Sequence, residues 1–191
     1  MMLFILGLFI VKGSMKWALL AATILSILLS WGRNFMPFTD FFLDYVPMYA
    51  KFRTVASILV IAEFTIPLLA MMALKRIVDE PELLTKKMKL VYVSFGLTAG
   101  FCALFALMPG TFFSDFVSAG EYHALQQIPE EYRIPLMSNL TEMRKAVFSA
   151  DCWRSFWIIV IGTAFLFLYK MRKVGAEVMI AGLAILCLVD M

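Results

Sequence analysis

Residues 90–108 read LVYVSFGLTAGFCALFALM and contain no charged side chain. An apolar helix of about 20 residues is long enough to cross the hydrocarbon core of a bilayer. The whole chain shares this character, since 62% of its 191 residues are hydrophobic and only 16% are charged. Water-soluble domains hold about 45–50% apolar and about 25% charged residues. The composition therefore excludes a soluble enzyme, a disordered chain and a secreted disulfide scaffold.

Similar apolar runs occur on both sides of this one. The sequence therefore predicts an all-α fold: a polytopic membrane helix bundle with interfacial helices and one larger extracytoplasmic loop. Residues 1–11 are apolar but too short to cross alone, so we interpret them as the end of a helix and the chain as a piece of a longer protein. The expected single membrane domain, 1–191, has spans at about 1–11 (partial), 17–31, 54–74, 90–108, 155–169 and 174–189, with outer links at 32–53 and 109–154.

Lysine and arginine are distributed unevenly among the links. The three short links, 12–16, 75–89 and 170–173, hold ten of the seventeen basic residues. Cytoplasmic loops carry an excess of Lys and Arg. We therefore expect the short links to face the cytoplasm and the two long links to lie outside.

The first outer link combines an aromatic stripe at helical spacing with charges on the reverse side, the pattern of a helix lying in the membrane interface. Such a helix is either a simple anchor or a ledge beside a polar cavity, where Arg53 meets a phosphate. The planar guanidinium suits that task because it binds phosphate oxygens bidentately. The stripe consists of Phe35, Phe38, Phe42, Tyr45, Tyr49 and Phe52.

Glu63 lies about ten residues into the expected span 54–74. Charge at that depth is costly, so such a residue normally faces the protein interior, a partner or water. Pro67 lacks an N–H and releases the carbonyl of Glu63 from the helical ladder. The pair predicts either the wall of a polar pocket or a glutamate that hydrogen-bonds neighbouring helices.

The second outer link contains the largest polar stretch. Pro129 and Pro135 are expected to bound a short separate segment, and Asn139 followed by Glu142 resembles a capping box at a helix start. From Leu140 to Tyr169 the apolar residues keep helical spacing, which predicts one nearly continuous helix that projects beyond the bilayer.

The polar side of this predicted helix carries Arg144, Asp151 and Arg154. Because Asp151 and Arg154 are three residues apart, we expect them to form a surface ion pair.

Other chemistry-bearing residues are sparse. His123 is the single histidine and the three cysteines are scattered, so neither a metal site nor a disulfide framework is expected. No phosphate loop, dinucleotide fingerprint or nucleophile motif is present. A net charge of +3 is too small to indicate nucleic acid. The sequence therefore predicts no cofactor, no metal and no nucleic-acid partner.

Two runs carry a family resemblance: WGRNFMPFTDFFLDYVPMYAKFRTVASILVIAEFTIPLLA (31–70) and RKAVFSADCWRSFWII (144–159). They resemble the later membrane portion of YfhO-family bacterial membrane proteins, which are much longer polytopic proteins. The most telling stretch is Pro-x-Tyr-x-x-Phe-Arg, formed here by Pro47, Tyr49, Phe52 and Arg53. The resemblance implies a multi-pass protein of the bacterial cytoplasmic (inner) membrane.

The same resemblance implies a relation to type C glycosyltransferases, which use polyprenyl-phosphate sugars outside the cytoplasmic membrane. Expected partners are membrane lipids, a polyprenyl-phosphate sugar donor and an envelope-polymer acceptor. The catalytic acidic residue of such enzymes belongs to an earlier loop, outside this chain. Arg53 and Lys51, with Tyr49 and Tyr45, are the expected lipid-phosphate or substrate-binding residues. The alternatives are a non-catalytic membrane scaffold module and a transporter with an intramembrane site at Glu63.

Overall fold

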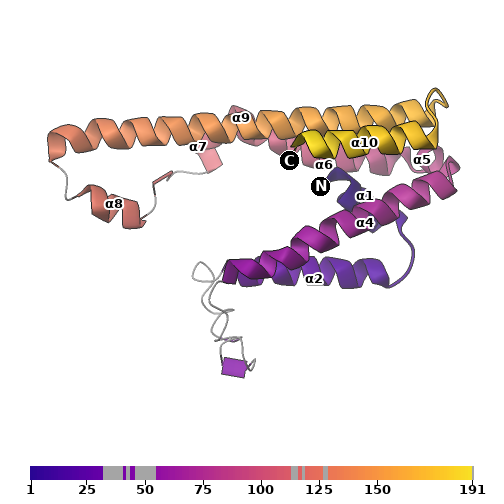
Figure 1. The fold of residues 1–191 in the computed structure, drawn as a ribbon, viewed down its shortest axis with the longest axis horizontal. Helices are drawn as coiled ribbons and strands as arrows, with labels where there is room; N and C mark the ends of the chain where they lie inside the picture. The colour runs from indigo at the N-terminus through magenta and orange to yellow at the C-terminus, as the bar shows by residue number, and fades with distance from the viewer. Residues whose placement is uncertain are drawn as a thin grey trace. The chain divides into compact units, whose positions relative to one another are not determined.

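The computed structural model describes residues 1–31, 41, 44–45, 55–112, 116–117, 119–126 and 129–190. Within these ranges every regular element is a helix and no strand occurs, so the all-α prediction is confirmed for them (Figure 1). The elements are α1 (Met2–Ile10), α2 (Met15–Ser30), η3 (Val55–Ile58), α4 (Leu59–Asp79), α5 (Glu82–Lys86), α6 (Met88–Leu107), α7 (Pro109–Phe112), α8 (Ala119–Leu125), α9 (Glu130–Lys170) and α10 (Ala176–Asp190).

Among the described helices, α6 and α9 are long and apolar enough to cross a membrane, judged by length and composition alone. Helix α2 is a shorter apolar helix. The chain divides into two compact units, Met1–Ser94 and Phe95–Met191. The single domain with six spans stays a prediction.

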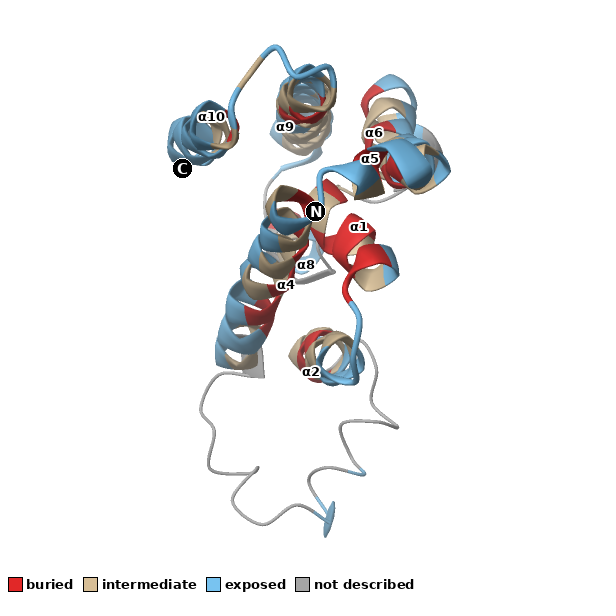
Figure 2. Cartoon of the chain, turned by 90° about the vertical axis from the view of Figure 1, so that its right-hand side faces the viewer, coloured by how far each residue is buried: buried red, intermediate tan, exposed pale blue. Residues whose placement is uncertain are grey.

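In the first unit, α1 is a largely buried helix, drawn mostly red in Figure 2. Leu6 and Ile10 are almost completely buried. A Cβ added to Gly7 would lie 2.9 Å from the carbonyl oxygen of Leu69 and 3.3 Å from the Cβ of Ala73. Small residues at a helix–helix contact let the backbones approach closely. Glycine therefore sets the distance between α1 and α4.

The link from α1 to α2 is a tight turn. Gly13 has a φ of 106°, a backbone conformation that favours glycine because it lacks a Cβ. The Nζ of Lys16 donates a hydrogen bond of 2.9 Å to the carbonyl of Leu8 and lies 5.4 Å from the ring centroid of Trp17. The side chain of Lys16 thus supplies a donor to the end of α1.

Helices α2 and α4 contact each other through hydroxyl groups as well as apolar side chains. The hydroxyl oxygens of Thr23 and Thr65 lie 2.7 Å apart, and both residues are buried. The hydroxyl of Ser26 donates to the carbonyl of Ile58 over 2.6 Å, where η3 joins α4. Each buried polar group in this contact has a hydrogen-bond partner, as burial requires.

In the second unit, α10 packs against α9 after a short turn that includes Arg172 at a φ of 55°. A Cβ added to Gly182 would lie 2.8 Å from ring carbons of Phe165, and one added to Gly162 would lie 3.6 Å from Leu183. Glycines on both helices therefore allow large side chains of the partner helix to fit.

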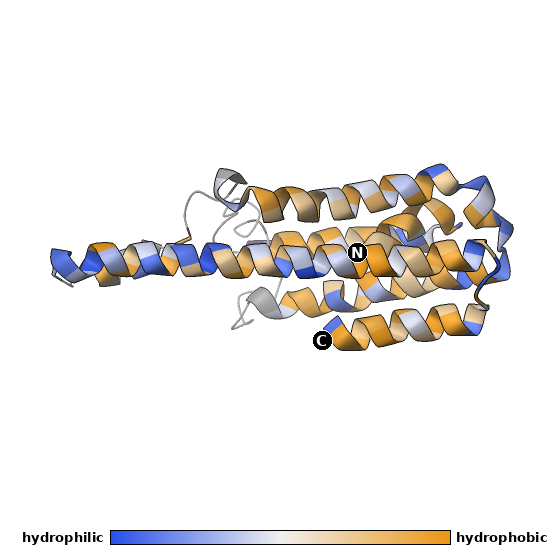
Figure 3. Ribbon diagram, turned by 90° about the horizontal axis from the view of Figure 1, so that it is seen from above, coloured by the Kyte–Doolittle hydropathy of each residue, from blue (hydrophilic) through white to orange (hydrophobic). Residues whose placement is uncertain are grey.

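Helix α9 runs unbroken from Glu130 to Lys170, so the predicted continuous helix over residues 140–169 is confirmed. Its first half is more hydrophilic than its second half (Figure 3). The prediction that Pro129 and Pro135 bound a separate segment is wrong, because the helix begins directly after Pro129 and contains Pro135.

The early start of α9 has a local cause. The carbonyl of Pro129 accepts the N–H groups of Tyr132 and Arg133, each over 3.1 Å. Glu130 and Glu131 occupy the first turn, where negative charge interacts favourably with the helix dipole. Pro135 lacks the N–H that would bond to the carbonyl four residues earlier, and α9 nevertheless continues through it.

Candidate functional site

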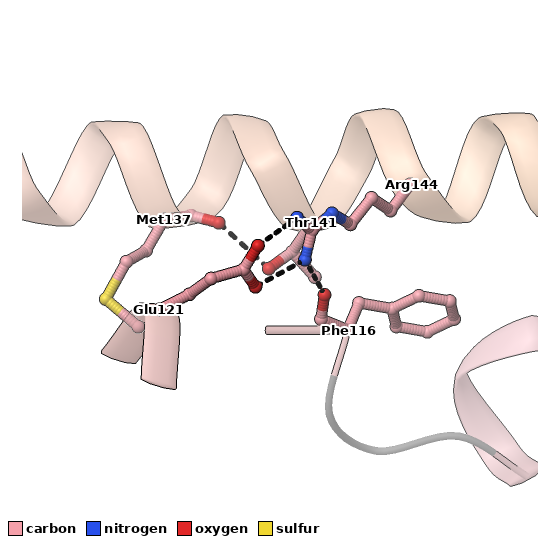
Figure 4. Close-up of polar contacts among 5 residues, drawn as sticks. All are labelled: Phe116, Glu121, Met137, Thr141 and Arg144. Carbon is pink, nitrogen blue, oxygen red and sulfur yellow. Dashed lines mark hydrogen bonds and ion pairs between the residues drawn. The ribbon is translucent and has the colours of Figure 1, made fainter. Parts of the chain in front are cut away.

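Arg144 on α9 binds Glu121 on α8 through two parallel hydrogen bonds (Figure 4). The Nη1–Oε2 distance is 2.9 Å and the Nη2–Oε1 distance is 2.7 Å. Nη1 also donates to the backbone carbonyl of Phe116. Bidentate arginine–carboxylate pairs fix orientation as well as position. Arg144 thus attaches both α8 and the residues before it to α9.

The hydrogen bond to Glu121, together with the negative charge of that carboxylate, raises the pKa of Arg144. The side chains are 41% and 44% exposed, so water screens their attraction. Exposed pairs of this kind contribute little to overall stability, so the role of this pair is to position α8 on α9.

Phe116 is the centre of the surrounding contacts. Its ring meets the ring of Phe148 edge-on, with centroids 6.3 Å apart, and the Nζ of Lys145 lies 5.7 Å from its centroid. We call Phe116, Glu121, Arg144, Lys145 and Phe148 the loop anchor. Of these, the sequence indicated Arg144 alone. The 23 residues between Glu121 and Arg144 give no local spacing signal that would have revealed the pair.

The loop anchor lies next to the end of α6. The hydroxyl of Ser149 donates to the carbonyl of Ala106 over 2.9 Å, and the rings of Phe105 and Phe148 are 6.4 Å apart. These contacts fix which residues of α9 lie beside the last turn of α6. The residues before Ser149 therefore extend past that end.

Arg154 pairs with Asp190 at the end of α10, with 3.1 Å between Nη2 and Oδ1. It also donates to the carbonyl of Asp190 over 3.3 Å. The predicted pair with Asp151 is therefore wrong. Asp190 offers Arg154 both its carboxylate and its backbone carbonyl as acceptors.

Three aromatic rings follow on α9. The rings of Trp153 and Phe156 are 5.6 Å apart, and those of Phe156 and Trp157 are 5.7 Å apart, both in edge-to-face arrangements.

The remaining predicted site residues belong to the first unit, and part of them is described. Arg53, Lys51 and Tyr49 lie outside the described residues. Tyr45 is exposed, and its ring centroid lies 5.0 Å from that of Phe41. Glu63 is exposed on α4, outside the buried stripe of that helix.

Within the described ranges, no group of three or more His, Cys, Asp or Glu side chains is placed to hold a metal ion. Comparisons of the chain with family models, with curated proteins and with solved structures give no match.

Proposed function

We propose that the chain is a multi-pass module of the bacterial cytoplasmic membrane. The observation that carries this proposal is the length and apolar character of α6 and α9. The basic short links support it, because their charge fits the cytoplasmic side.

Exposed apolar side chains on the second unit add support. Many exposed large apolar side chains suit contact with lipid. They include Phe101, Leu104, Leu107, Trp157, Ile161, Ile185 and Leu188.

The proposed activity is sugar transfer from a polyprenyl-phosphate donor to an envelope polymer. It rests on the family resemblance of residues 31–70 and 144–159. In this proposal Arg53 and Lys51 bind the lipid phosphate, Tyr45 and Tyr49 lie beside it, and an earlier part of a longer protein supplies the carboxylate base that such a reaction needs.

A non-catalytic scaffold is the second candidate. The loop anchor favours it, because a bidentate pair that orients a loop on a long helix builds a defined surface without any catalytic group. Transport through a site at Glu63 has no comparable support, since that residue is exposed in the first unit.

The membrane proposal is tested by cysteine labelling. Cys102, Cys152 and Cys187 are first replaced by Ser, and single cysteines are then introduced as Ser138→Cys or Thr85→Cys. Both positions are exposed, so membrane sidedness alone decides their access. A membrane-impermeant maleimide should label Ser138→Cys in intact spheroplasts and Thr85→Cys only after permeabilisation. Labelling of Thr85→Cys in intact spheroplasts would contradict the topology.

The proposed activity is tested with Arg53→Lys in the complete protein, in membranes supplied with a labelled polyprenyl-phosphate sugar. A bidentate phosphate site should lose most transfer at normal expression, because Lys cannot replace the planar fork. Arg133→Lys, a matched change on α9, should leave transfer unchanged. Equal transfer by Arg53→Lys and the parent would reject the phosphate role of Arg53, whereas no transfer by the parent would favour the scaffold.

A further inference from the structure

Lys145 is the second cation of the loop anchor, next to Arg144 in the chain. The neighbouring charge of Arg144 is matched by Glu121. Among the residues that the structure describes, no carboxylate lies within ion-pair distance of the Lys145 ammonium. Its Nζ instead lies over the ring of Phe116 and beside Gly110, where an added Cβ would be 3.7 Å away.

The register between α6 and α9 gives the depth of this ammonium in a bilayer. Helix α6 has 20 residues, which span about 30 Å, the thickness of the hydrocarbon core. Ser149 is bonded to Ala106 in the last turn of α6. Lys145 lies one turn further along α9, about 6 Å beyond that level. This is the layer of the lipid phosphates.

We infer that Lys145 binds the phosphate of an anionic phospholipid headgroup, held in place by Phe116 and Gly110. The inference rests on the proposed membrane location. A cation–π contact supports the ammonium without neutralising it, and an ammonium has three N–H donors. A phosphate at this depth accepts those donors. The C-terminal carbonyls of α6 also favour a cation nearby, and they require no lipid, so the test must separate the two roles.

Tryptophan quenching measures this binding directly, because Trp153 and Trp157 lie two to three turns from Lys145. Trp17→Phe and Trp31→Phe make these two the only reporters. The protein is reconstituted into phosphatidylcholine vesicles in which either phosphatidylglycerol or phosphatidylcholine carries bromine on its acyl chains. Brominated phosphatidylglycerol should quench more strongly at equal mole fraction.

Lys145→Gln should lower the preference for phosphatidylglycerol about fivefold, the amount typical of one basic residue at an anionic surface. Lys145→Arg should keep it. Lys173→Gln, a matched change in the turn after α9, should leave it unchanged. The inference would be overturned if Lys145→Gln kept the parent's preference for phosphatidylglycerol at equal helix content by circular dichroism. Lys145 would then interact only with the C-terminal carbonyls of α6.

Inorganic phosphate, compared with chloride at equal ionic strength, separates the two phosphate sources. Unchanged quenching supports the lipid headgroup, whereas loss of the phosphatidylglycerol preference would assign the site to free phosphate. Protein that leaves the vesicles in an alkaline wash would instead contradict the membrane proposal itself. Protein that stays bound but is quenched equally by both lipids would contradict the Lys145 site alone.

Discussion

The hydroxyl oxygen of Thr65 on α4 lies 2.7 Å from that of Thr23 on α2, and the Thr23 hydroxyl also lies 2.7 Å from the carbonyl of Leu19. Each hydroxyl has one proton to donate. If Thr23 donates to Leu19, then Thr65 donates to Thr23. The carbonyl of Ala62, 3.4 Å from the Thr65 hydroxyl, is a weaker acceptor. The two threonines therefore form a short chain of hydrogen bonds across the helix contact.

Replacing either threonine by Val should lower the free energy of unfolding by about 0.5–1 kcal/mol, the range for hydrogen bonds between membrane helices. The double variant should lose less than the sum of the single losses, because each single change already removes the shared bond. Unfolding in mixed micelles measures these values. Thr141→Val is the control, since Thr141 bonds to Met137 on its own helix. Additive losses would contradict the coupling.

Gly7→Ala should destabilise the first unit by about 1–3 kcal/mol, because the new methyl group would press against the backbone of α4 and overpacking has that cost. Gly96→Ala is the matched control. An added Cβ there meets nothing within 4 Å, so the change should be neutral or stabilising through helix propensity. Thermal unfolding followed by circular dichroism compares the two, and equal melting temperatures would show that α1 does not pack as described.

Arg144→Gln should release the loop from α9 and speed chymotrypsin cleavage after Tyr122, an exposed residue of α8. Because the pair is exposed, the increase in cleavage rate should be modest, roughly fivefold or less. The exchange Arg144→Glu with Glu121→Arg should restore part of the protection, although not the bond to the Phe116 carbonyl. Arg133→Gln, which loses a pair within one turn of α9, should cleave like the parent. No rescue by the exchange would argue against the pair.

The raised pKa of Arg144 sets the pH dependence of this protection. A group whose pKa is higher in the folded protein contributes fully below its unfolded pKa, and the contribution is lost only as pH rises through the folded value. Cleavage after Tyr122, corrected for protease activity, should therefore be constant from about pH 7 to about pH 10. Arg144→Lys should lose protection toward about pH 11, because lysine titrates there.

Arg154→Gln should loosen the end of α10 more than Asp190→Asn, since it removes both the ion pair and the donor to the Asp190 carbonyl, whereas Asp190→Asn removes the ion pair alone. Asp151→Asn should have no such effect. Hydrogen exchange of the amides in the last turn of α10 measures this. If only Asp151→Asn exchanged faster, the result would instead support an ion pair between Asp151 and Arg154 within α9.

Local patterns explain most of what could be predicted. The apolar run at 90–108 and the helical spacing after Leu140 indicated α6 and the unbroken part of α9, because both depend on neighbouring residues. The predicted helix begins at Leu140, ten residues after the observed start of α9 at Glu130. The difference arises because Pro135 is expected to end a separate segment, whereas it lies inside α9.

The partners of Arg144 and Arg154 could not be predicted in the same way. Glu121 and Asp190 approach these arginines only after α8 and α10 have packed against α9, at sequence separations of 23 and 36 residues. The arginines themselves were recognisable because charge stands out in an apolar chain. Spacing rules identify partners within one helix, and for Arg154 they favoured the wrong carboxylate.

Because α9 is one unbroken helix, a rotation about one contact moves its two ends by different distances. Gly162, which lies against α10, is about 12 Å from Lys170 and about 48 Å from Glu130 at 1.5 Å per residue. A pivot at that contact would enlarge any displacement of the short arm about fourfold at the far end. A tilt of about 5° would move Glu130 by roughly 4 Å. In the proposed membrane location, a change in bilayer thickness that tilts α9 would thus displace the Glu130 end of the helix.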